Sequence, residues 1–121
     1  MLIKTEYSKI QPYTTKDGSI IRELMHPSVH GNTLQSLAEA IVPAGSSTLP
    51  HRHLQAEEIY HFVEGSGLMI LGDDQFEIRV GDTIYIPPGT THRIKNTGTV
   101  PLKILCCCTP PYSHDDTELL R

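Results

Sequence analysis

The sequence predicts an all-β fold, an antiparallel sandwich or barrel, and two patterns indicate it. Short apolar segments recur along the chain, and Gly or Pro interrupts them at close spacing. In one of these segments, Phe76, Ile78 and Val80 alternate with the charged residues Glu77 and Arg79. Such alternation is typical of a strand with one buried face and one solvated face. Both patterns favour strands over helices for most of the chain.

The expected strands follow one another in chain order, each bounded by turn residues. They are residues 19–25, 34–42, 58–63, 68–71, 76–80, 83–86, 91–95 and 102–108. Residues 26–32 are expected to form a loop, because Pro27 and Gly31 interrupt them. Residues 72–75 combine Gly and Asp between two apolar segments, which predicts a hairpin. Pro88 and Gly89 suit the central positions of a type II turn.

One of these segments, residues 34–42, is ambiguous. Leu34, Leu37, Ala38 and Ile41 recur with helical spacing, although the end of the segment would also extend a strand. We assign a strand, because the rest of the chain has the pattern of a β protein.

The two ends of the chain have weaker patterns. Residues 1–18 are polar and mixed, with a turn signal at Lys16-Asp17-Gly18. The C-terminal tail, residues 109–121, is expected to form one short helical turn toward Leu119 and Leu120, capped by Ser113 or Asp115.

Length, charge and composition limit the class of protein. We interpret residues 1–121 as a single domain, since 121 residues leave little room for a second one. The net charge of −4 offers no attraction to phosphate backbones and argues against a nucleic-acid partner. No segment approaches the roughly 20 apolar residues that cross a bilayer, and no signal peptide is apparent. The three cysteines are consecutive, at 106–108, which is not a disulfide framework, and we expect a cytoplasmic protein.

Histidines at positions 51, 53 and 92 are the main candidates for chemistry. His51 and His53 are two residues apart, so on a strand both imidazoles point to the same side. Glu58 has the opposite parity and joins them only if residues 54–57 form a loop or bulge. His92 lies just past a tight turn. Three imidazoles and one carboxylate suit a first-row divalent metal; the alternative at this point is that the histidines are solvated strand residues.

Two motifs that contain these residues resemble those of a known family. Residues 45–65 read Gly, five residues, His-x-His, four residues, Glu, six residues, Gly. Residues 81–96 read Gly, five residues, Pro-x-Gly, two residues, His, three residues, Asn. Every signature position of both cupin motifs is filled, and the chain therefore resembles the cupin superfamily.

The resemblance implies a cupin double-stranded β-helix, a jelly-roll-like antiparallel barrel with a metal ion in its mouth. The implied cofactor is one divalent transition metal ion, Fe, Mn, Ni, Co or Zn. Its implied ligands are His51, His53, Glu58 and His92. Glu57 is the rival acid, but the six-residue spacing to Gly65 selects Glu58.

Other residues are candidates for supporting roles. Tyr60 shares the inward parity of the acid ligand and is a candidate hydrogen-bond donor in the pocket, with core filling as the alternative. His114, in the tail, is a candidate to close over the mouth and act as a base. His61 has outward parity and is placed toward a subunit contact. Cys106 and Cys108 share a strand face, and we interpret them as small buried hydrophobes rather than as metal ligands or a redox pair.

The function expected from these features is that of a metal-dependent enzyme acting on a small oxygenated molecule. The reaction would be of the dioxygenase, isomerase or epimerase, or lyase type. The alternative is a non-catalytic, metal-dependent binding or sensor module for a small ligand. A homodimer is expected by resemblance to small cupins, with residues 19–25 as a strand at the contact.

Overall fold

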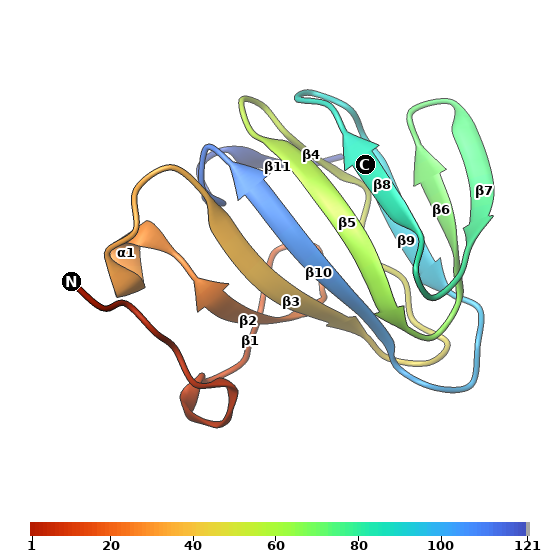
Figure 1. The fold of residues 1–121 in the computed structure, drawn as a ribbon. Coiled ribbons are helices and arrows are strands. Elements are labelled where there is room, and N and C mark those ends of the chain that lie inside the picture. Colours follow the sequence, from red (N-terminus) through yellow and green to blue (C-terminus); the bar gives the residue numbers. More distant parts are fainter. Residues whose placement is uncertain (121) are drawn as a thin grey trace.

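Two antiparallel β-sheets face each other in the computed structural model, which describes residues 1–120 (Figure 1). The strands are β1 Tyr13–Thr14, β2 Ile20–Met25, β3 Ser36–Val42, β4 His51–His53, β5 Glu57–Glu64, β6 Gly67–Leu71, β7 Asp74–Ile78, β8 Thr83–Ile86, β9 His92–Asn96, β10 Leu102–Thr109 and β11 Thr117–Leu119. Helical structure in the described residues is limited to the 3-10 turn Tyr7–Lys9 and the short helix α1, Pro27–His30. The all-β antiparallel fold expected from the sequence is confirmed.

The order of the strands places distant parts of the chain side by side. One sheet has six strands in the order β1-β2-β3-β10-β5-β8, and the other has five in the order β11-β4-β9-β6-β7. The ambiguous segment 34–42 forms β3, between β2 and β10. The prediction of a strand there is confirmed, because pairing on both sides outweighs the helical spacing of its leucines.

The side chains between the sheets change in size along the strands, which leaves space at one end. At one end of β3, β10 and β5, Val42, Leu102 and Phe62 fill the interior and are almost fully buried. At the other end, Cys108 pairs with Ser36 on β3 and with Glu58 on β5. Small and polar side chains therefore replace large apolar ones, and a cavity results whose wall combines polar and apolar side chains.

The C-terminal tail departs from its expected structure. Residues 117–119 form the strand β11 and not a helical turn: Thr117 pairs with His53, and Leu119 pairs with His51. The edge of β4 would otherwise present unpaired backbone groups, and β11 covers it. Strand pairing over a long sequence separation thus outweighs the local capping signals of Ser113.

Two smaller expectations were also wrong. The segment 26–32 is not only a loop, because His26 caps α1, with Pro27 in its first turn and Gly31 in a left-handed conformation at its end. The strand expected over 76–80 ends at Ile78, and Val80 is 61% exposed. None of the helices in residues 1–120 is long and apolar enough to cross a membrane.

Candidate metal centre

Three buried histidines meet at the polar end of the interior. His51 and His53 lie on β4, and His92 begins β9, where it pairs directly with His51. The three residues are 2%, 5% and 1% exposed. They are therefore buried, and the alternative that they are solvated strand residues is wrong. One nitrogen from each ring lies within 4.8 Å of the others, close enough to share one metal ion.

Hydrogen bonds to backbone carbonyl oxygens fix the orientation of two of these rings. His51 Nδ1 lies 2.8 Å from the carbonyl oxygen of Leu49, and His92 Nδ1 lies 3.0 Å from that of Thr90. A carbonyl oxygen only accepts, so each Nδ1 carries the proton and donates it. Each Nε2 is therefore left with its lone pair, which is the arrangement of a metal-binding imidazole.

The third ring, His53, is oriented by the C-terminal strand. Its Nδ1 lies 3.0 Å from the hydroxyl oxygen of Thr117. Thr117 donates its own hydroxyl proton to the carbonyl oxygen of Ser113, at 2.8 Å, and so accepts from His53. The Nε2 of His53 is thereby also free as a ligand.

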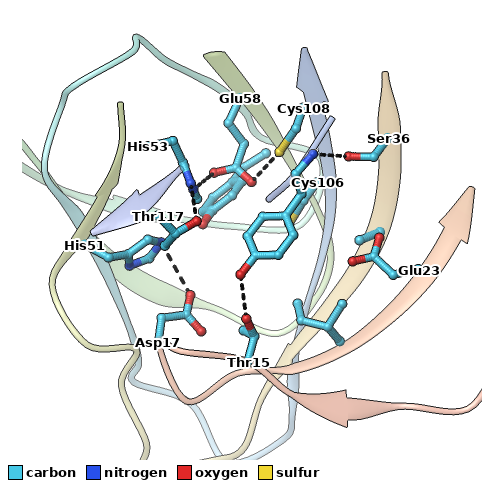
Figure 2. A pocket seen from close by; sticks show the side chains of 14 residues that line it. Thr15, Asp17, Glu23, Ser36, His51, His53, Glu58, Cys106, Cys108 and Thr117 are labelled. Atoms are coloured by element: carbon cyan, nitrogen blue, oxygen red, sulfur yellow. Dashed lines mark hydrogen bonds and ion pairs between the residues drawn. The ribbon is translucent and has the colours of Figure 1, made fainter. Parts of the chain in front are cut away.

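Glu58 reaches the histidines because a short connection reverses the parity of the chain, as the sequence required. Residues 54–56 separate β4 from β5, and the carboxylate of Asp116 accepts hydrogen bonds from the backbone N–H groups of Gln55 and Ala56. Glu58 Oε1 then lies 3.2 Å from His53 Nε2 (Figure 2). It also lies 3.5 Å from His92 Nε2. Both Glu58 Oε1 and His92 Nε2 are buried without an aligned hydrogen-bond partner in residues 1–120. A cation bound between them would satisfy both atoms, so the donor set fits a divalent metal.

The surroundings of His51 and His53, the two histidines on β4, shift their pKa values in opposite directions. Burial, and then the neighbouring charge of His92, lower the pKa of His51 to about 4. Burial also disfavours charge on His53, but its contact with Glu58 outweighs burial and raises its pKa. Burial opposes the charge on Glu58 as well; the contacts with His53 and His92 outweigh it, and the pKa of Glu58 falls well below its usual range. Glu58 is therefore a carboxylate, ready to hold a cation.

A second carboxylate at the centre was not found from the sequence. Asp17 Oδ2 lies 3.4 Å from His51 Nε2, on the side away from Glu58 (Figure 2). Its other oxygen accepts from the backbone N–H of Ser19 at 2.9 Å and from the Ser19 hydroxyl at 2.6 Å. Asp17 belongs to the turn 16–18, where its residue type signalled only a turn; no spacing linked it to the histidines.

A cavity of about 40 Å³ adjoins the histidines, and Tyr60 is part of its wall. Tyr60 is 5% exposed, and its ring stands edge-on to that of His92, with 5.8 Å between ring centroids. Burial, and then the charge of Glu58, raise the pKa of Tyr60 well above its usual value. Its hydroxyl therefore stays protonated and can donate.

The two ends of the chain meet over this cavity. The hydroxyl of Tyr112, from the tail, lies 2.8 Å from Thr15 Oγ1, from the N-terminal segment, and 3.0 Å from His114 Nδ1. His114 itself is exposed and lines a neighbouring depression rather than the cavity. Tyr112, which the sequence did not single out, thus stands between His114 and the histidine cluster.

The cysteines take two different positions. Cys106 and Cys108 are buried and free, and both line the cavity. Cys108 Sγ donates to Glu58 Oε2 at 3.2 Å. Burial and the charge of Glu58 raise the pKa of Cys108, so its thiol keeps the proton that it donates. His61 points away from the interior and bonds to Thr83 at 2.8 Å.

Comparisons with known proteins agree with this fold. A family model described as a cupin domain matches residues 38–108. An uncharacterised protein of Methanocaldococcus jannaschii is 66% identical over 99% of this chain and 96% of its own length. The structure of the polyketide cyclase RemF from Streptomyces resistomycificus is similar with a TM-score of 0.82 and 21% identity, over 100% of this chain and 87% of that one. A formate complex of oxalate decarboxylase from Lactobacillus farciminis gives a TM-score of 0.80 and 22% identity, over 93% of this chain but only 34% of that one.

Proposed function

From the premise that this chain belongs to the cupin family, we propose that it is a metal-dependent enzyme acting on a small oxygenated molecule. The proposal treats residues 1–121 as one cupin domain. Its metal ligands are His51, His53, Glu58 and His92. One observation carries it: three buried imidazoles donate through Nδ1 and leave Nε2 free beside a buried, unpartnered carboxylate oxygen.

A bound divalent ion would supply Lewis acidity, polarising a carbonyl or enolate oxygen, or a site for dioxygen. Residues of the chain would bind the substrate, exclude water and accept a proton. Tyr60 keeps its hydroxyl proton and donates a hydrogen bond to a substrate oxygen in the cavity. Thr15 and Tyr112 bond to each other over the cavity and exclude water. The Tyr112 hydroxyl, which lines the cavity, gives its proton to His114 Nδ1 and takes one in return from a hydroxyl group of the ligand, so that His114 acts as the base.

The reaction belongs to the dioxygenase, isomerase or epimerase, or lyase type, and the metal decides among them. Elemental analysis of protein purified without a chelating tag identifies the metal. Oxygen uptake and a metabolite panel are then measured with Fe(II)- and Mn(II)-loaded protein. Turnover supports the enzyme. Saturable binding without turnover of any panel compound would instead establish a binding or sensor module.

We also propose that the protein forms a homodimer through the outer face of its six-stranded sheet. Leu37, Cys107, Ile59 and Tyr85 form one row across β3, β10, β5 and β8. Leu37, Ile59 and Tyr85 are 37%, 43% and 52% exposed, which is an apolar row on an otherwise solvated surface. Light scattering after size-exclusion chromatography should give twice the 13.5 kDa of the chain, and Ile59→Glu should give the monomer mass. A wild-type mass of one chain would refute the dimer.

The location proposed for the protein is the cytoplasm. All three cysteines are free thiols, and two of them are buried, which suits a reducing compartment. Fractionation of the source cells with an antibody against the protein tests this location.

A further inference from the structure

We propose that the cavity selects a small uncharged molecule with two hydroxyl groups, such as a diol or hydroxy ketone, and disfavours dicarboxylates. Asp17 and Glu23 would accept the hydrogen bonds of the two hydroxyls. This inference rests on the proposed function, because it concerns the molecule that meets the metal ion.

Glu23 presents an acceptor that nothing in the described chain uses. It lies on β2, and its Oε1 accepts from the hydroxyl of Tyr13 at 2.7 Å. Its Oε2 is buried and has no hydrogen-bond partner among residues 1–120. Glu23 lines the cavity across from the histidines (Figure 2). A buried acceptor without a partner is costly, so a ligand that donates to it would bind more tightly.

Asp17 presents the second acceptor, beside the histidines. Ser19 satisfies Oδ1 twice, through its N–H and its hydroxyl, and holds the carboxylate in one orientation. Oδ2 faces the cavity, where its near neighbour is the Nε2 of His51, which has no proton to donate. Oδ2 is therefore free to accept from a ligand.

The charges around the cavity argue against an anionic ligand. Three carboxylates line it, Asp17, Glu23 and Glu58, and no Lys or Arg of the described residues does. The neighbouring cations are engaged elsewhere: Lys16 donates to backbone carbonyls of the tail, and Arg22 pairs with Glu39. With a divalent cation bound, two positive charges oppose three negative ones, a balance of 2 − 3 = −1. A dianion would add to this excess inside a buried site.

An ammonium group would also reduce the excess negative charge of the cavity, but a hydroxyl group fits the combination of a metal ion and carboxylates better. A hydroxyl oxygen has lone pairs for a metal ion and a proton for a carboxylate, whereas an ammonium group has no lone pair to offer. The cavity of about 40 Å³ is a few times the roughly 10–15 Å³ that one water requires by the same measure. It therefore admits a few polar groups, which suits a molecule with a short carbon chain.

Dihydroxyacetone and oxalate make a matched test, because they have equal numbers of non-hydrogen atoms and differ in charge. Titration of each into Co(II)-loaded protein, followed by calorimetry and by the visible absorption of cobalt, gives two dissociation constants. Wild-type protein should bind dihydroxyacetone more tightly than oxalate. Glu23→Gln and Asp17→Asn should each shift the ratio of the two constants toward oxalate by about tenfold, the worth of one hydrogen bond to a charged acceptor.

The control is Glu64→Gln, which removes the same charge from a surface pair with Lys103 and should leave the ratio unchanged. Thermal melts establish that each variant is folded, and cobalt content is measured in every sample. Folded protein that retains cobalt but prefers oxalate, or binds neither compound, refutes the substrate class alone. An unchanged ratio in both cavity variants also refutes it. Protein that takes up no cobalt refutes the proposed function instead.

Discussion

Thr117 should control metal affinity although it is not a proposed ligand. It accepts the Nδ1 proton of His53 at 3.0 Å, and its own proton is fixed by Ser113 at 2.8 Å, so it holds the ring in one tautomer. Thr117→Val keeps the shape of the side chain and removes the acceptor. Losing such an outer partner costs about 10- to 100-fold in metal affinity, which is about 1.4 to 2.7 kcal/mol.

The measurement is the dissociation constant for Co(II) or Zn(II), obtained by competition with a chromophoric chelator. Thr83→Val is the matched control, because Thr83 makes the same kind of contact with His61, at 2.8 Å, on the outer face of the sheet. Denaturation with urea accounts for any loss of folded protein, since the Ser113 carbonyl also loses its donor. Equal metal affinity in wild type and Thr117→Val would show that the tail does not tune the centre.

Three further predictions concern the ligand set and the packing. Glu58→Gln should lose at least tenfold in metal affinity. Glu57→Gln should not, because Glu57 lies on the outer face of the sheet and accepts a hydrogen bond from the Tyr85 hydroxyl. Equal losses of the two variants in chelator competition would contradict the assignment of Glu58. Phe62→Ala should lower the free energy of unfolding by about 3–5 kcal/mol, since Phe62 is fully buried, and a loss below 1 kcal/mol in urea denaturation would contradict this. Gly67→Ala should destabilise the fold, because a Cβ there would lie 2.6 Å from the carbonyl oxygen of Lys95. Gly98→Ala, whose Cβ would have the Ser66 hydroxyl as its nearest atom at 3.1 Å, should lower the melting temperature less; an equal loss in both variants would contradict this.

Local patterns predicted eight of the strands, all except β1, β4 and β11, and the resemblance of the two motifs supplied the four proposed ligands. Alternation along β7 and β5 anticipated which residues face inward, and strand parity brought His51 and His53 to one side. Glu58 required the additional inference that a short connection resets the parity, and residues 54–56 do so. These features depend on the spacing of residues that are close together in the sequence, so the sequence alone is enough to predict them.

The remaining parts of the site depend on long-range pairing. Asp17, Tyr112 and Thr117 come from the two ends of the chain. Thr117 reaches His53 through the pairing of β11 with β4, and Asp17 reaches His51 from the turn 16–18. No periodicity or motif spacing links them to residues 51–92. Glu23 lay in an expected strand, but its unused oxygen is a property of three-dimensional packing.

The pairing of β11 with β4 also sets an order of events during synthesis. The three histidines and Glu58 leave the ribosome before Thr117, which lies 64 residues beyond His53 and holds its ring. Asp116, which clamps the connection before Glu58, comes equally late. A growing chain therefore carries its ligands without their supports. A chain interrupted before residue 116 would lack both supports and would leave this edge of β4 unpaired.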